Sequence, residues 1–382
     1  MPTEILPDEL ALREVRRERA LAHMEAHDLD ILVLGRPAHV RYVTGARQLW
    51  VAGTRPFGPS CVLVRDTGAI YLVSTWDEGV PEDIPHERLF GLTWNPRHLI
   101  AELQGIEGAA TARRVGTDAM SPGFARLLPE AFPVAELVDG ESAMRAARRV
   151  KTADEVAALR AAIAVAEDSL ATAVGVLRPG VTERELSGVL LEAAAAGGVT
   201  TPSTQEVAWV TSRDQRWRRR TDATGQVGPG DLVAFTVGVV AGGYIGEVGR
   251  TWPAEGADAA DAAAHRALYR RWEELWDRLA AACHPGARGG ELIAAYEAAG
   301  EPLPPMPVAR GLGLGFDPPV ITPDLPETAA AEELEPGMVI AVTAAVWQEG
   351  AGAVIGREAV LITPDGSEVL TSSPFWNRRS DG

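Results

Sequence analysis

Alternating apolar and polar positions predict an α/β domain over residues 1–145. Apolar residues recur on one side of the segment 8–28, which is typical of an amphipathic helix. The apolar run 29–34 follows and indicates a short strand that ends at Gly35. Two more apolar runs, 61–64 and 69–73, flank a turn at 66–68 and predict a hairpin. Helical and strand segments then alternate to about residue 140, as in α/β domains.

The pattern changes in a second domain, residues 146–382. Two capping boxes predict helices that begin near residues 152 and 182. Strands dominate from 205 to 253, around a hairpin turn at Gly242-Gly243. We expect helices over about 257–283 and 290–299, strands over 338–347 and 353–363, and a loop with one short strand over 302–326. Helix pairs packed on a mostly antiparallel sheet make this an α+β domain.

Composition narrows the class of protein. The chain has 382 residues, 46% hydrophobic and 23% charged, as in ordinary globular proteins. A net charge of −17 argues against a nucleic-acid partner, because such a chain repels phosphate backbones. Two cysteines alone cannot build a cysteine zinc site and favour a reduced, cytoplasmic setting. There is no signal-peptide core and no run of ~18 apolar residues, so no membrane partner is expected.

Several short strings stand in an order and spacing that resemble one family. They are His39–Gly45, Arg149–Thr152 with Glu155, Gly230–Val233, Gly243-Tyr244, Arg250-Thr251, Gly311–Gly313, Leu334–Met338 and Ala359–Thr363. Each string is weak alone, but the ordered set runs from about residue 12 to 370 and resembles the creatinase, aminopeptidase P and prolidase family. The resemblance implies a creatinase-like α/β N-terminal domain, an α+β pita-bread C-terminal domain and a homodimer.

The family's peptidases carry five metal ligands, and the flanking strings locate those positions here. One carboxylate remains, Glu247, whereas the other four positions hold Thr236, Arg310, Thr343 and Arg357. A guanidinium has no lone pair to donate, and two of them repel a cation. The resemblance therefore implies a member of the family without a metal and without another cofactor.

The altered positions favour an anion-binding site. An arginine binds a carboxylate or phosphate through two parallel hydrogen bonds. We expect Thr236, Glu247, Arg310, Thr343 and Arg357 to meet in one pocket. In this interpretation the two arginines bind a small anionic substrate, and Glu247 neutralises only one of them. The alternative is a buried salt-bridge cluster that fills the former metal site and has no function.

A second basic segment contains five arginines between residues 213 and 220, with Trp217 among them. In the family this segment borders the entrance to the site, so Arg218 is a candidate for binding an acidic substrate. A solvated loop or strand edge is the alternative interpretation. Tyr244, directly after the Gly-Gly turn, is a further candidate for substrate binding.

Three classes of function remain open. The first is a metal-independent enzyme that hydrolyses a C–N bond in a small, anionic, nitrogen-containing substrate, for which creatinase is the family precedent. The second is a non-hydrolytic enzyme on the same scaffold, catalysing elimination, isomerisation or decarboxylation. The third is a non-catalytic binding module.

No histidine follows His284, so the candidate catalytic bases are the carboxylates of Glu247, Glu358 and Asp317. A carboxylate becomes a useful base when burial raises its pKa, whereas an adjacent arginine lowers it, so the substrate must separate the two. Because neighbouring strand residues point to opposite faces, Glu358 is expected to point away from Arg357.

Overall fold

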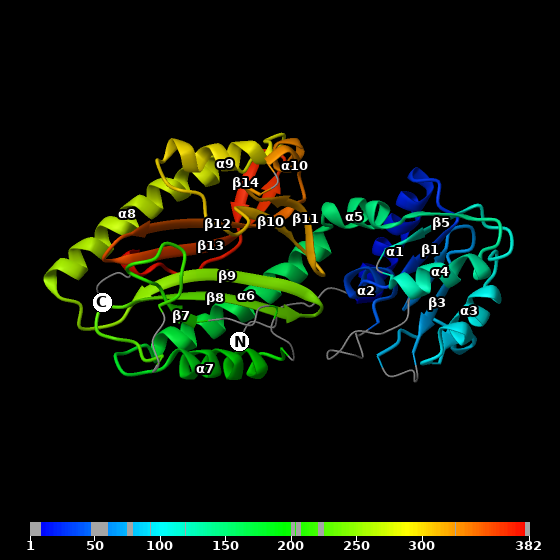
Figure 1. Ribbon diagram of the computed structural model, residues 1–382, viewed down its shortest axis with the longest axis horizontal. Helices are drawn as coiled ribbons and strands as arrows, with labels where there is room; N and C mark the ends of the chain where they lie inside the picture. The colour runs from blue at the N-terminus through cyan, green and yellow to red at the C-terminus, as the bar shows by residue number, and fades with distance from the viewer. Residues whose placement is uncertain are drawn as a thin grey trace. The chain divides into compact units, whose positions relative to one another are not determined.

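The computed structural model describes residues 9–46, 60–74, 79–91, 93–118, 120–199, 203, 208–220, 225–324 and 326–378. The chain divides into two compact units between Arg148 and Arg149 (Figure 1). Each unit has its own sheet and its own hydrophobic core. Within the described residues, no helix is long and apolar enough to cross a membrane.

The N-terminal unit is an α/β domain, as the sequence predicts. Its mixed six-stranded sheet has the order β4-β3-β2-β1-β5-β6. The strands are β1 (Ile31–Leu34), β2 (Cys61–Val64), β3 (Ile70–Val73), β4 (Leu89–Phe90), β5 (Arg114–Thr117) and β6 (Glu136–Asp139). The helices are α1 (Glu9–Ala26), α2 (Pro37–Thr44), α3 (Pro96–Gln104), α4 (Pro122–Ala131) and α5 (Glu141–Arg149). Strands β2 and β3 form the expected antiparallel hairpin.

The C-terminal unit is the expected α+β domain with a mostly antiparallel sheet. Eight strands have the order β11-β10-β12-β13-β9-β8-β7, and β14 pairs with β13. The strands are β7 (Ala208–Val210), β8 (Leu232–Ala241), β9 (Tyr244–Pro253), β10 (Ala309–Leu312), β11 (Phe316–Ile321), β12 (Val339–Gln348), β13 (Gly352–Thr363) and β14 (Gly366–Val369). The helices are α6 (Ala153–Gly175), α7 (Glu183–Ala196), α8 (Ala259–Ala281), α9 (Gly289–Ala298) and α10 (Pro326–Ala331). Figure 1 shows the long strands between the α6/α7 pair and the α8/α9 pair.

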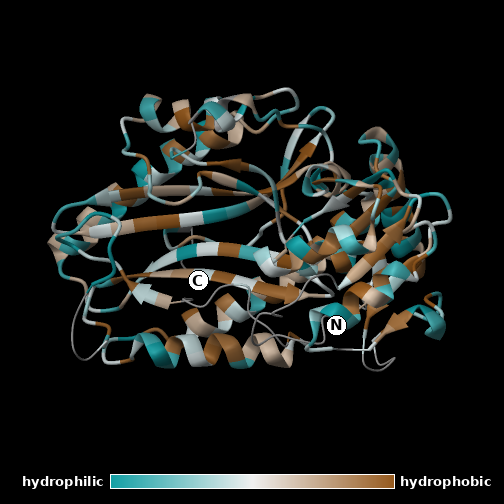
Figure 2. Cartoon of the chain, turned by 45° about the vertical axis from the view of Figure 1, so that its right-hand side comes forward, coloured by the Kyte–Doolittle hydropathy of each residue, from teal (hydrophilic) through white to brown (hydrophobic). Residues whose placement is uncertain are grey.

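Residue alternation along these strands separates two faces of the sheet. On β8, Val233, Phe235 and Val237 belong to the core that contains α6 and α7 residues. On β12, Val342 and Ala344 belong to the core that contains α8 and α9 residues. The intervening residues point to the opposite face, which we call the inner face. Figure 2 shows the resulting change between brown and paler or teal residues along the long strands.

The helix starts follow the predicted capping boxes. Thr152 and Glu155 cap α6 reciprocally, and Thr182 and Glu185 cap α7 in the same way.

The prediction of a loop with one short strand over 302–326 is wrong, because two paired strands, β10 and β11, lie there. Prolines are tolerated in β11 because it is an edge strand of the sheet. On its outer side a missing N–H group interrupts no hydrogen bonds to a neighbouring strand.

Candidate functional site

A row of four residues crosses the inner face of the C-terminal sheet. Thr236 on β8 pairs with Gly249 on β9, Gly249 pairs with Arg357 on β13, and Arg357 pairs with Thr343 on β12. The Arg357 Nε atom donates a hydrogen bond to Thr343 Oγ1 at 3.1 Å. Gly249 is required here, since a Cβ at that position would lie 2.7 Å from Arg357 Cβ. The sheet register therefore brings Thr236, Thr343 and Arg357 onto one line.

Glu247 lies beside this row and joins two arginines. Its Oε1 atom accepts a hydrogen bond from Arg310 Nη2, and its Oε2 atom lies 3.4 Å from Arg357 Nη1. Arg310 comes from β10, which pairs with β12. Each carboxylate oxygen contacts a different guanidinium, so Glu247 lies between both arginines although its single charge can balance only one of them. We call Arg310 and Arg357 the arginine pair.

The arginine pair carries one positive charge more than Glu247 can balance. Glu247 is fully buried, whereas the side chains of both arginines are 13% exposed. Burial lowers the pKa of Arg357, and the neighbouring Arg310 lowers it further, while Glu247 opposes both effects. Arginine stays protonated throughout the physiological range. The site is therefore a nearly buried cationic centre, with only a small part of each arginine side chain exposed.

Glu358 points away from the arginine pair, as strand alternation predicts. It accepts a hydrogen bond from Arg250 Nη2 at 3.0 Å and another from the hydroxyl of Thr371. Burial raises the pKa of Glu358, and the contacts with Arg250 and Thr371 oppose that rise. The structure thus places this candidate base in a separate ion pair on the other side of the sheet.

Asp317 and Tyr244 are tied to the start of α6. Lys151 Nζ lies 2.8 Å from Asp317 Oδ2, and both side chains are 1% exposed. The Tyr244 hydroxyl donates to Glu155 Oε1 at 3.1 Å. The backbone at Gly313 comes so close that a Cβ there would lie 1.9 Å from Asp317 Oδ2. Each of these two candidates therefore has a buried polar partner in the segment 151–155, where α6 begins.

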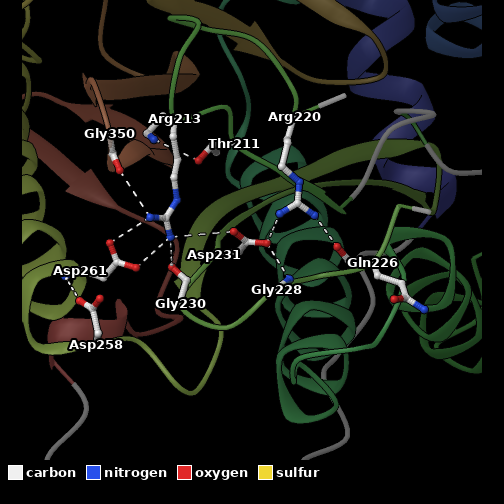
Figure 3. A network of polar contacts seen from close by, with 11 residues as sticks. Thr211, Arg213, Arg220, Gln226, Gly228, Gly230, Asp231, Asp258, Asp261 and Gly350 are labelled. Atoms are coloured by element: carbon white, nitrogen blue, oxygen red, sulfur yellow. Dashed lines mark hydrogen bonds and ion pairs between the residues drawn. The ribbon is translucent and has the colours of Figure 1, made fainter. Parts of the chain in front are cut away.

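The basic segment 213–220 is anchored by acidic partners. Arg213 binds both carboxylate oxygens of Asp261 at 2.9 and 3.0 Å and donates to the carbonyl oxygens of Gly230 and Gly350 (Figure 3). Arg220 binds Asp231 in the same network. These contacts fix the loop to the start of β8 and to the α8 helix.

The remaining arginines of the segment differ in exposure and partners. Arg219 donates to Glu183 at 2.9 Å, so among the residues that the structure describes, three of the five arginines have acidic partners. The Arg216 guanidinium lies 5.4 Å from the centre of the Trp347 ring. Arg218 is exposed. Within the described residues, Arg216 and Arg218 are therefore the arginines of this segment that an acidic substrate would meet first.

The residues at the former ligand positions do not fit a divalent metal ion. Such an ion needs several oxygen or nitrogen donors, and the only carboxylate here already has both oxygens engaged by guanidiniums. In the part of the chain that the structure describes, no group of three or more His, Cys, Asp or Glu residues could hold a metal ion. The chemistry of this donor set suits an anion instead.

Comparisons with known proteins place both units in one family. A family model described as metallopeptidase family M24 matches residues 157–364, and one described as the creatinase/prolidase N-terminal domain matches residues 16–150. The chain belongs to metallopeptidase family M24, with a creatinase-type N-terminal domain. This confirms the resemblance and the pita-bread fold expected from the sequence.

Individual relatives show a range of activities. The dimethylsulfoniopropionate lyase DddP of Roseovarius nubinhibens is 27% identical over 416 residues, covering 97% of this chain and 88% of the lyase. Among solved structures, the prolidase from Pyrococcus horikoshii has a TM-score of 0.76 and 17% identity, covering 94% of this chain and 99% of the prolidase. Dipeptidase PepE from Mycobacterium ulcerans has a TM-score of 0.70 and 23% identity, covering 96% and 97% of the two chains. The two structures support the fold. The family model is described as one of metallopeptidases, and one relative of this chain is a lyase.

Proposed function

We propose that this chain is a metal-independent enzyme that cleaves a C–N bond hydrolytically in a small, anionic, nitrogen-containing substrate. The observation that carries the proposal is the arginine pair, which shares one buried carboxylate at the positions where the resemblance expects metal ligands. An anion bound there would balance the excess positive charge. Buried charges are costly unless they are paired, which favours a ligand that completes the site.

Glu247 is the candidate base that this geometry favours. An incoming substrate carboxylate would take over guanidinium hydrogen bonds that Glu247 now accepts. A Glu247 oxygen released in this way could accept the proton of the attacking water, as a positioned carboxylate does in general base catalysis. Glu358 and Asp317 already form ion pairs with Arg250 and Lys151 outside this contact.

Elimination is a second candidate reaction, favoured by the similarity to a lyase over nearly the whole chain. In that case Glu247 would remove a proton from substrate carbon, and no water would be consumed. Turnover in ¹⁸O-labelled water distinguishes the two reactions, because only hydrolysis places the label in a product. Binding without turnover of any nitrogen-containing acid would favour a binding module.

Substitution of Arg310 tests the anion site. We expect Arg310→Lys to weaken binding of small carboxylates by about 5- to 150-fold, corresponding to ~1–3 kcal/mol for a lost charge-assisted hydrogen bond. Arg310→Ala should weaken it more, because the charge is also lost. Calorimetric titration with acetate and larger carboxylates measures both effects. Arg160→Ala, which removes an exposed arginine paired with Glu368, serves as the control, and equal binding by wild type and Arg310→Ala would contradict the proposal.

Metal analysis tests the proposal that the enzyme works without a metal ion. We expect purified protein to contain no stoichiometric Mn, Co, Zn or Fe, because the family ligand positions hold threonine and arginine. Elemental analysis measures the content directly, and a chelator should leave the unfolding temperature and carboxylate binding unchanged. One metal ion per chain, removable with loss of either property, would show that the proposal is wrong.

A further inference from the structure

Tyr296 on helix α9 contacts the backbone of strand β12 next to the arginine pair. Its hydroxyl group donates a hydrogen bond to the carbonyl oxygen of Thr343 at 2.8 Å and accepts one from the Ala345 N–H group at 3.1 Å. The side chain is fully buried, and burial raises the pKa of its hydroxyl group, which therefore keeps the proton that it donates. One side chain thus binds two backbone groups of β12.

The Tyr296 hydroxyl group takes the place of a neighbouring strand. Within the described residues, β12 pairs with β10 over 340–342, and the Thr343 N–H group then donates to the carbonyl oxygen of Val308, just before β10 begins. Thr343 and Ala345 are alternate residues, so their backbone groups point to the same side of β12. Backbone groups that are buried without a partner are costly. Tyr296 supplies that partner where the pairing with β10 has ended.

Thr343 also binds Arg357. Its Oγ1 atom accepts a hydrogen bond from Arg357 Nε at 3.1 Å, and Nη1 of the same guanidinium lies 3.4 Å from Glu247 Oε2. A guanidinium is planar, so a hydrogen bond at Nε restricts the directions of its other N–H groups. Tyr296 therefore binds the carbonyl group of the residue whose side chain orients Arg357.

Helix α8 restricts the same part of the sheet. Trp272 Nε1 donates to the carbonyl oxygen of Ala344 at 2.9 Å. Gly356, which pairs with Ala344 and precedes Arg357, leaves no room for a side chain, since a Cβ there would lie 2.3 Å from the Trp272 ring. The two helices thus contact three successive residues of β12, from Thr343 to Ala345. The position of Thr343 Oγ1 follows from these backbone contacts.

We propose that Tyr296 is a positioning residue for the arginine pair. Its hydroxyl group holds the Thr343 backbone so that Oγ1 orients the Arg357 guanidinium toward Glu247 and toward a bound carboxylate. The inference rests on the proposed function for the carboxylate, whereas the contacts among Tyr296, Thr343 and Arg357 are made without a ligand. It can therefore be tested both with and without one.

A double-mutant cycle in urea unfolding tests the inference without a ligand. Tyr296→Phe removes the hydroxyl group and keeps the ring, and Thr343→Val removes Oγ1 and keeps the branched side chain. A hydroxyl group that only satisfied the backbone would contribute equally whether residue 343 is threonine or valine, because it binds the carbonyl group. We expect Tyr296→Phe to cost less stability in the Thr343→Val variant than in wild type. Equal costs would overturn the inference.

Calorimetric titration with acetate measures the effect on the anion site. Thr343→Val should weaken acetate binding about 2- to 12-fold, as expected for one hydrogen bond. Tyr296→Phe should weaken it by a similar or smaller factor and should add nothing to the effect of Thr343→Val. The matched control is Tyr42→Phe, since Tyr42 is a buried tyrosine of the N-terminal unit that donates to the carbonyl oxygen of Ala147 at 2.9 Å. It should leave acetate affinity unchanged.

The two measurements separate this inference from the proposed function. If Arg310→Ala loses acetate binding while Tyr296→Phe binds acetate like wild type, the anion site stands and the positioning role of Tyr296 is overturned. If wild type binds no acetate while the unfolding cycle shows the expected dependence on residue 343, Tyr296 positions the arginine pair and the proposed anion site is wrong. If neither result is obtained, both proposals fail.

Discussion

Replacing Glu247 by glutamine is expected to destabilise the protein by about 3–5 kcal/mol, the usual cost of removing one partner from a buried ion pair. The variant keeps the size of the side chain but removes the negative charge that contacts both guanidiniums of the arginine pair. Urea unfolding at neutral pH measures the loss. Added small carboxylates should restore part of the stability, because a ligand that binds only the folded state stabilises it.

Two further variants separate charge from packing in this result. Removing one guanidinium as well, in Glu247→Gln with Arg357→Met, should recover stability relative to Glu247→Gln alone, because fewer buried charges then lack a partner. The control is Glu368→Gln, which breaks an exposed ion pair with Arg160 and should cost under about 1 kcal/mol. If Glu247→Gln is as stable as this control, then Glu247 does not balance the arginine pair.

The sequence predicts most elements of the fold because their signals are local. The reciprocal capping of Thr152 by Glu155 and the Gly-Gly turn at 242–243 each lie within a few residues, and the structure confirms both. The sequence predicts only one short strand over 302–326, where the structure has β10 and β11. Prolines usually exclude a central strand, and only the topology shows that β11 is an edge.

The site was only partly predictable, because its charges are balanced across long separations in the sequence. The short motifs that flank the family's ligand positions identify Glu247, Arg310 and Arg357 in the sequence. They do not show that the Glu247 carboxylate contacts both arginines. The basic segment 213–220 suggests an anion-attracting entrance when read alone. Its partners Asp231 and Asp261 lie up to 48 residues away from Arg213, so the sequence shows the cations without the carboxylates that anchor them.

The packing of Trp209, Trp217 and Trp347 against one small apolar cluster was not predicted. In the sequence Trp217 stands among arginines, and Trp209 and Trp347 are 138 residues apart. One signal could have found this packing. Trp209 is flanked by Ala208 and Val210, which are buried and point to the opposite face. The large side chains therefore had to share a face with the altered ligand positions.

A methyl group added at Gly246 should disturb both stability and binding, because this residue lies directly before Glu247 and faces helix α6. A Cβ at Gly246 would lie 2.2 Å from the carbonyl carbon of Ala162, a backbone atom that no side-chain rotation can move. Overpacking of a core costs ~1–3 kcal/mol and sometimes more. We expect Gly246→Ala to reach at least the upper end of this range in urea unfolding.

The effect on binding follows from the same contact. Helix α6 and strand β9 must separate to admit the methyl group, and the shift moves Glu247 relative to the arginine pair. Carboxylate affinity of Gly246→Ala should therefore fall, although the substituted side chain points away from the inner face. Gly188→Ala is the matched control, since Gly188 is exposed on α7 with open space around it and should gain ~0.5–1 kcal/mol from the better helix former. If Gly246→Ala unfolds and binds like Gly188→Ala, close packing of α6 against β9 does not position Glu247.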